Sequence, residues 1–208
     1  MKTKRKSYLT AVCALFSFLC AAAALAGAAM AQQQASGPDN ATAAVSAVKP
    51  LIVWYSRAGH SQLVAETLQK QLGCDMDTIA SKKDRSFFSI VNEQFLGAED
   101  DQEKCKRDLS AYNAVIIAAP IYFMKLCAPA RTFMELNRKA LKGKDLYLFV
   151  TLGGKLPEGK VTAIKEYGAG LGLNIKGVFF LQIGKQEEFP QRVSEILKTT
   201  PLQTAGAK

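Results

Sequence analysis

The sequence lacks the residues on which most metal and nucleophile chemistry depends. Histidine occurs only once, as His60, and the 208 residues contain no CxxC motif and no Cys/His cluster. A zinc site, or a Cys–His catalytic pair drawn from several histidines, is thereby largely excluded. No constellation of a general base and a nucleophile stands out either. The sequence therefore predicts no catalytic residue, no metal site and no hydrolase.

Basic segments with interleaved aromatic side chains are also missing. The formal net charge is +9, and removal of the first 31 residues, which carry four Lys or Arg and no acid, lowers it to +5. Such a mild excess favours a solvated basic surface over a nucleic-acid interface. We therefore expect no nucleic-acid partner.

The first 31 residues have the organisation of a signal peptide. A basic start, Met1–Lys6, precedes an uncharged run over 7–31 that is rich in Ala, Leu and Phe and ends in Ala29-Met30-Ala31. The run is long enough to leave a retained membrane anchor as the alternative. Its second half, however, is mostly weakly apolar Ala and Gly, and its end suits a peptidase. We predict cleavage after Ala31, an exported and periplasmic protein, and membrane contact only through an uncleaved signal.

Three cysteines remain after such cleavage: Cys74, Cys105 and Cys127. An odd number cannot pair completely. In an oxidising compartment, one disulfide between Cys74 and Cys105 is compatible with the sequence.

The rest of the chain divides into three parts by composition. Residues 32–48 are small and polar and predict a flexible tether, 49–200 form the folded domain, and 201–208 are expected to be a disordered tail. Within the domain, apolar stretches alternate with helical patterns. Strands are expected at 49–55, 75–80, 113–119, 146–151 and 178–183, and helices at 61–72, 87–95, 128–141, 158–171 and 188–197. Because the central stretches are apolar throughout, they predict a parallel α/β sheet covered on both faces.

Ligands bind such sheets at the carboxyl ends of the strands, so the loops there are the candidate site. The first loop offers hydroxyls, a glycine and free N–H groups at a helix start, which favour an anion. The second places a tyrosine after a proline that is expected to end its strand, and the third has paired glycines that admit a flat ligand. Ser61 is also expected to cap the first helix. The candidate residues are Ser56, Arg57, Ala58, Gly59, His60, Ser61, Pro120, Ile121, Tyr122, Phe123, Thr151, Leu152, Gly153 and Gly154.

Together, the three loops resemble those of the flavodoxin family, and the resemblance covers nearly all of residues 50–198. Ser56, Gly59 and Ser61 match the family's phosphate loop, Pro120 to Tyr122 its Pro-x-aromatic segment, and Thr151 to Gly154 its Thr-x-Gly-Gly segment. The resemblance implies a three-layer sandwich whose five-stranded parallel sheet has the order 2-1-3-4-5. It also implies an FMN cofactor, with its phosphate at the first loop, its ring against Tyr122 and the ring edge near Gly153.

One position departs from the family pattern. Ala58 stands where a hydroxyl usually contacts the phosphate, which removes a hydrogen bond worth about 1.5–3 kcal/mol to a charged acceptor. Arg57 or His60 is a candidate to replace it. The sequence therefore leaves two functions open. The first is electron transfer or an FMN-dependent oxidoreductase activity, with a redox partner protein or a small acceptor such as a quinone; the alternative is an exported binding module that has lost FMN.

Overall fold

The computed structural model describes residues 48–80, 102, 105–157 and 159–202. The chain divides into two units, Met1–Ala44 and Val45–Lys208, and every described residue belongs to the second unit. The predicted signal peptide 1–31, the tether up to residue 47, the helix at 87–95 and the tail residues 203–208 lie outside the described residues.

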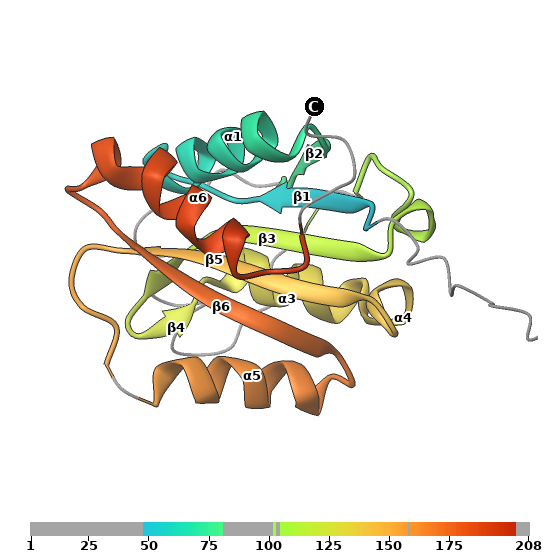
Figure 1. Cartoon of the computed structure of the whole chain (residues 1–208). Coiled ribbons are helices and arrows are strands. Elements are labelled where there is room, and N and C mark those ends of the chain that lie inside the picture. Colours follow the sequence, from blue (N-terminus) through green and yellow to red (C-terminus); the bar gives the residue numbers. More distant parts are fainter. Residues whose placement is uncertain (1–47, 81–101, 103–104, 158, 203–208) are drawn as a thin grey trace, which may run out of the picture. The chain divides into compact units, whose positions relative to one another are not determined.

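Strands and helices alternate along the domain (Figure 1). The strands are β1 (Pro50–Trp54), β2 (Asp75–Thr78), β3 (Ala114–Tyr122), β4 (Lys125–Leu126), β5 (Asp145–Leu152) and β6 (Asn174–Gln182). The helices are α1 (His60–Leu72), α3 (Ala128–Leu136), α4 (Arg138–Leu141), α5 (Lys160–Gly170) and α6 (Phe189–Lys198), with short 3₁₀ turns at Leu109–Ala111 and Gln186–Glu188.

The five long strands form one parallel sheet in the order β2-β1-β3-β5-β6. Counted along the chain, these are the predicted five strands in the predicted order 2-1-3-4-5, so the fold class is confirmed. The strand that the sequence did not predict is β4, which pairs with β3 in the antiparallel direction.

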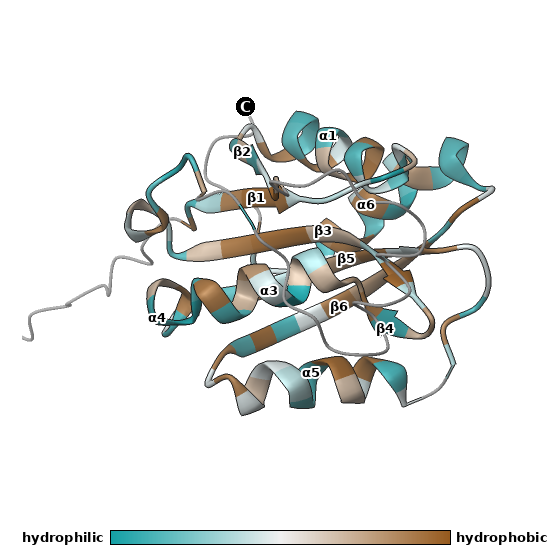
Figure 2. Ribbon diagram, turned by 180° about the vertical axis from the view of Figure 1, so that it is seen from behind, coloured by the Kyte–Doolittle hydropathy of each residue, from teal (hydrophilic) through white to brown (hydrophobic). Residues whose placement is uncertain are grey.

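Two apolar clusters, one on each face of the sheet, form the core. On one face, Val115 and Ile117 of β3 pack in a cluster with residues of α3, α4 and α5. On the other face, Ile116 belongs to a cluster with residues of α1 and α6 (Figure 1). Successive side chains of a strand point to opposite faces, so β3 is hydrophobic along nearly its whole length (Figure 2). The second cluster includes Leu202, which is fully buried, so packed structure continues two residues beyond the predicted end of the domain.

The expectation that Pro120 ends its strand is wrong, because β3 runs on to Tyr122. The carbonyl of Ala118 accepts a hydrogen bond from the N–H of Tyr55, which places Ala118 toward β1. Pro120 lies two residues later and faces the same side, beyond Trp54, the last paired residue of β1. Its missing N–H is tolerated there because β1 has ended, and no other described strand lies on that side to receive a hydrogen bond.

The predicted helix at 128–141 is divided in two at Asn137. The side-chain amide of Asn137 donates to the carbonyl of Phe133 at 2.9 Å and competes with the helical backbone pattern. The helical spacing of the sequence predicts that Phe133, Met134, Leu136 and Leu141 point inward. Phe133, Met134 and Leu141 are buried, but Leu136 is 64% exposed, so the prediction is wrong for Leu136.

The edge strand β6 contains a bulge. Leu146 of β5 pairs with Ile175, whereas the next residue, Tyr147, pairs with Gly177, so Lys176 is the extra residue. Among the described residues, no helix is both long and apolar enough to cross a bilayer.

Candidate functional site

The carboxyl ends of the parallel strands bring the first and third predicted loops into direct contact. Ser61 lies at the start of α1, and Thr151 lies near the end of β5, 90 positions later. Their hydroxyl oxygens are 2.8 Å apart, and both side chains are buried, at 1% and 0% exposure. This hydrogen bond fixes the start of α1 against β5.

The second predicted loop lies beside the third. Pro120 is the paired neighbour of Thr151 in the sheet, so the two segments run side by side. Tyr122 is half-buried and Phe123 is 49% exposed, whereas Ile121 is 3% exposed and packs into the core. The structure therefore gathers all three predicted loops at one edge, while Ile121 and Thr151 contribute buried side chains to the scaffold.

The start of α1 differs from its prediction. The N-cap residue is Gly59, in a left-handed conformation with φ 84°, and no side chain caps the helix. The expectation that Ser61 is the cap is wrong, since its hydroxyl turns inward to Thr151. Arg57, Ala58 and Gly59 are exposed. The first N–H groups of α1 thus face an open loop, which is an arrangement that favours a negatively charged group.

The paired glycines of the third loop leave open space. Neither Gly153 nor Gly154 has a positive φ, and a Cβ added to either would meet no atom within 4 Å. Among the described residues, no contact therefore requires glycine at these positions. Close approach of a flat ligand to the main chain is a physical reason for having glycine there.

A short hairpin beside the site escaped the sequence analysis. Tyr122 pairs with Lys125 across a two-residue turn, and the amide of Cys127 donates to the carbonyl of Pro120 at 3.1 Å. Both turn residues have positive φ, 49° for Phe123 and 61° for Met124, as type I′ turns require. The usual sequence signal for this turn, Asn-Gly or Gly-Gly, is absent, so the pattern could not reveal it.

The loop between β6 and α6 also reaches the site. The side-chain nitrogen Nε2 of Gln186 lies 3.0 Å from Nδ1 of His60, and the two residues are 126 positions apart in the chain. No local pattern marks a glutamine for such a contact. A long-range hydrogen bond of this kind follows only from the folded arrangement.

Among the described residues, none of Cys74, Cys105 and Cys127 forms a disulfide, so the disulfide between Cys74 and Cys105 is absent. Burial raises the pKa of both Cys74 and Cys105 to about 11, and the negative charges of Asp75 and Asp77 act in the same direction. Cys105 donates to Asp77 Oδ2 at 3.1 Å. Among the described residues, no three His, Cys, Asp or Glu side chains gather as a metal site would require.

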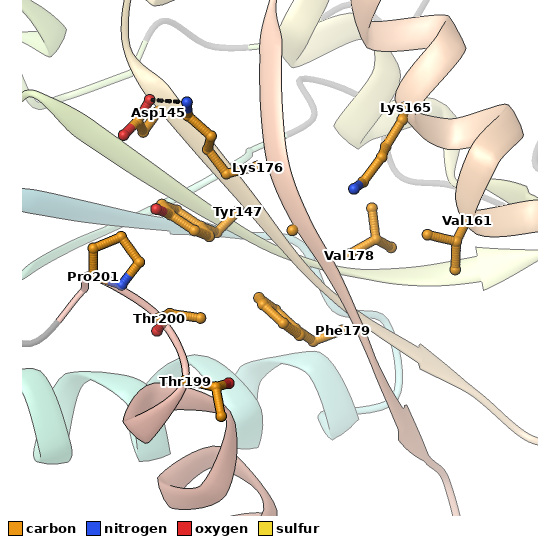
Figure 3. Close-up of a pocket in the computed structure, with 11 residues that line it drawn as sticks. Asp145, Tyr147, Val161, Lys165, Lys176, Val178, Phe179, Thr199, Thr200 and Pro201 are labelled. Carbon is orange, nitrogen blue, oxygen red and sulfur yellow. Dashed lines mark ion pairs between the residues drawn. The ribbon is translucent and has the colours of Figure 1, made fainter.

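A separate groove of about 480 Å³ lies near the opposite, amino ends of β5 and β6 (Figure 3). Its polar groups are largely paired within the protein: Lys176 lies 3.6 Å from Asp145, and the hydroxyls of Thr199 and Thr200 donate to carbonyls of α6. Because the predicted loops lie at the other ends of the strands, this groove is not the predicted site.

One protein-family model matches part of this chain. The family model of the flavodoxin domain matches residues 93–180, a segment that contains the second and third loops. The chain is similar to the flavodoxin domain over this segment. No curated protein matches it.

Solved structures agree with the flavodoxin-like fold. A flavoprotein candidate from Bacteroides eggerthii is 24% identical with a TM-score of 0.58, and the match covers 72% of this chain and 98% of that one. A flavoprotein from Lactobacillus acidophilus, solved in complex with FMN, is 18% identical with a TM-score of 0.54, covering 71% and 99%. The apo form of the flavoprotein from that organism gives 19% identity and a TM-score of 0.51, covering 69% and 97%. At these identities, the likeness establishes the fold.

Proposed function

We propose that this flavodoxin-like protein binds FMN at the carboxyl edge of its sheet and acts in electron transfer, or as an FMN-dependent oxidoreductase, outside the cytoplasm. The observation that carries the proposal is the convergence of the three loops, joined by the Ser61–Thr151 hydrogen bond and by the pairing of Pro120 with Thr151. A protein of the same fold has been solved in complex with FMN.

The described residues fit the parts of an FMN molecule. The uncapped start of α1 with Gly59 would hold the phosphate, and the exposed Gly153 and Gly154 leave room for a flat ring against the main chain. Tyr122 and the exposed Phe123 supply aromatic surface at the same edge. When bound, the flavin supplies the electron-transfer chemistry, while the protein binds and orients it.

The positive charge of Lys155, next to the third loop, affects the reduction potential of a flavin bound there. Lys155 follows Gly154 and is exposed. A positive charge at this place favours the addition of electrons to a nearby ring, so we propose a less negative reduction potential than that of an acidic relative. The electron acceptor is either a redox partner protein or a small molecule such as a quinone.

The decisive experiment is a titration of the purified chain, lacking residues 1–31, with FMN. Trp54 is the only tryptophan in the sequence, and it lies two residues before Ser56. Its buried indole N–H has no hydrogen-bond partner among the described residues. We expect FMN to quench Trp54 fluorescence and the loaded protein to be yellow. A colourless protein whose emission does not respond to FMN would overturn the proposal and favour a binding module that has lost FMN.

A matched pair of variants locates the site. Gly153→Leu places a side chain where a ligand would lie, without an internal clash, and Gly170→Leu does the same at a distant exposed glycine of α5. We expect the first variant to lose at least about tenfold in FMN affinity, because a blocked approach costs contacts worth at least 1.4 kcal/mol. The second variant should bind as the parent does. Equal affinities would place the ligand elsewhere.

Two further measurements test the role and the location. Rapid oxidation of a pyridine nucleotide by the loaded protein would favour an enzyme over a pure electron carrier.

Mass spectrometry of the protein recovered from outside the cytoplasm should give an N-terminus at Gln32. A full-length chain in the membrane would instead support the retained anchor.

A further inference from the structure

The hydrogen bonds of Gln186 determine which ring nitrogen of neutral His60 carries the proton. The backbone N–H of Gly184 donates to Gln186 Oε1 at 3.1 Å, so the oxygen of this amide is already engaged. The amide nitrogen therefore faces His60, at 3.0 Å from Nδ1. Since an amide NH₂ group only donates, Nδ1 of His60 has to accept.

Within the part of the chain that the structure describes, this arrangement leaves the Nε2 atom of His60 without a hydrogen-bond partner. A neutral imidazole that accepts at Nδ1 carries its proton on Nε2, so the second ring nitrogen is a donor. His60 is the first residue of α1, directly after Gly59 and two positions from Ala58. The Nε2–H group of His60 is therefore carried by the same end of α1 at which Ala58 lacks a hydroxyl.

The other candidate to replace the missing hydroxyl is less well held. Arg57 is exposed, whereas His60 is half-buried and is tied on one nitrogen to the loop between β6 and α6. A side chain that is already fixed loses little conformational freedom when it binds a ligand.

We propose that Gln186 holds His60 in the Nε2–H form and that this N–H donates to the phosphate of the bound flavin in place of the hydroxyl absent at position 58. Gln186 is then a positioning residue that acts through His60. The contact to phosphate rests on the proposed function, whereas the proton position of His60 does not.

The proton position can be measured directly, because the chain has a single histidine. In protein labelled with ¹⁵N-histidine at pH 8, we expect an unprotonated Nδ1 and a protonated Nε2. Gln186→Leu should give a mixture of both tautomers, while Gln191→Leu, a change at an exposed glutamine of α6 that pairs with Glu195, should leave the spectrum unchanged. A protonated Nδ1 in the parent, or an unchanged spectrum for Gln186→Leu, would overturn the proposal.

The contact to phosphate is tested by comparing FMN with riboflavin, which lacks the phosphate. His60→Asn keeps an amide near the Nδ1 position only, and His60→Gln keeps a donor near the Nε2 position. We expect His60→Asn to weaken FMN binding about tenfold or more without changing riboflavin binding, and His60→Gln to retain most of the FMN affinity.

Two outcomes of this comparison are distinguishable failures. If His60→Asn binds FMN as tightly as the parent, the contact to phosphate is wrong although the protein is a flavoprotein. If the parent binds neither flavin, the proposed function fails and the contact fails with it, while the ¹⁵N spectrum still decides the role of Gln186.

Discussion

At the scale of single residues, buried polar side chains join segments that lie far apart in the chain. Ser61 is tied to Thr151, and Asp77 accepts hydrogen bonds from the backbone N–H groups of Lys106 and Arg107. Asp77 is only 7% exposed. Removing one partner of such a hydrogen bond lowers the free energy of unfolding, because the remaining partner stays buried without a hydrogen bond to water.

The Ser61–Thr151 pair gives a prediction for a double-mutant cycle. We expect Ser61→Ala and Thr151→Val each to lower the free energy of unfolding by about 1–3 kcal/mol, since each leaves one buried hydroxyl unpaired. The double variant should lose clearly less than the sum, because no hydroxyl is then left unpaired. Urea unfolding at neutral pH measures all four proteins, and strictly additive losses would contradict the coupling.

Asp77 gives a prediction for pH dependence. Burial alone would raise its pKa, but hydrogen bonds from the Cys105 thiol and from the backbone N–H groups of Thr78, Arg107 and Lys106 outweigh it, so the pKa lies below 3.8. The carboxylate therefore stabilises the fold fully above pH 3.8, and this contribution is lost as the pH falls through the lower pKa of the folded state.

The variant Asp77→Asn tests this sign. We expect it to be less stable than the parent by about 1–3 kcal/mol at pH 7, because an amide accepts these donors less strongly. The difference should narrow as the pH is lowered from 5 to 2, measured by urea unfolding at each pH. A difference that widens in acid would show that the pKa of Asp77 is raised rather than lowered.

At the scale of elements, close backbone approach determines how α5 lies on the edge of the sheet. A Cβ added at Gly168 would clash with the Cδ1 and Cγ1 atoms of Ile175 in β6. Gly170, two residues later in the same helix, has nothing within 4 Å of such an atom. Position 168 therefore requires glycine, whereas position 170 has room for a side chain.

We therefore expect Gly168→Ala to destabilise the domain by about 1–3 kcal/mol through overpacking. Gly170→Ala should leave stability unchanged or raise it by up to about 1 kcal/mol, because alanine is the better helix former. Thermal unfolding of both variants is sufficient to check this. The packing of α5 on β6 would be wrong if Gly168→Ala were as stable as the parent.

The β3–β4 hairpin gives a prediction in which stability and binding move in opposite directions. Phe123 and Met124 occupy left-handed backbone positions that cost other residues than glycine about 1–2 kcal/mol each. Replacing the pair by Asn-Gly should therefore raise the free energy of unfolding. The same change removes exposed aromatic surface at the proposed site, so we expect FMN affinity to fall. A variant that is more stable and binds FMN unchanged would show that Phe123 makes no contact with the ligand.

At the scale of the whole molecule, the sequence was sufficient for the architecture and insufficient for the details of the site. Apolar stretches such as 113–119 identify buried strands, and parallel strands necessarily bring their following loops to one edge. The course of β3 through Pro120 depends on where β1 ends, which only the assembled sheet shows. The contact between His60 and Gln186 spans 126 positions and has no local signal.

The proposed ligand should also be visible in the unfolding of the entire domain. A ligand that binds only the folded state stabilises it by an amount that grows with the logarithm of its concentration, by about 2.7 kcal/mol at a hundredfold excess over Kd. We expect FMN to raise the Tm in this way, and riboflavin to raise it less because it lacks the phosphate. A Tm that is independent of FMN concentration would exclude selective binding to the native fold.

The bulge at Lys176 has a consequence for how neighbouring molecules meet. An open sheet edge is a template on which a second chain can add a strand and begin a fibre. Here an incoming strand would encounter a backbone pattern that is interrupted at the bulge, rather than a flat row of donors and acceptors. The one-residue bulge thus makes the edge strand β6 less suited to edge-to-edge pairing with a second copy of the chain.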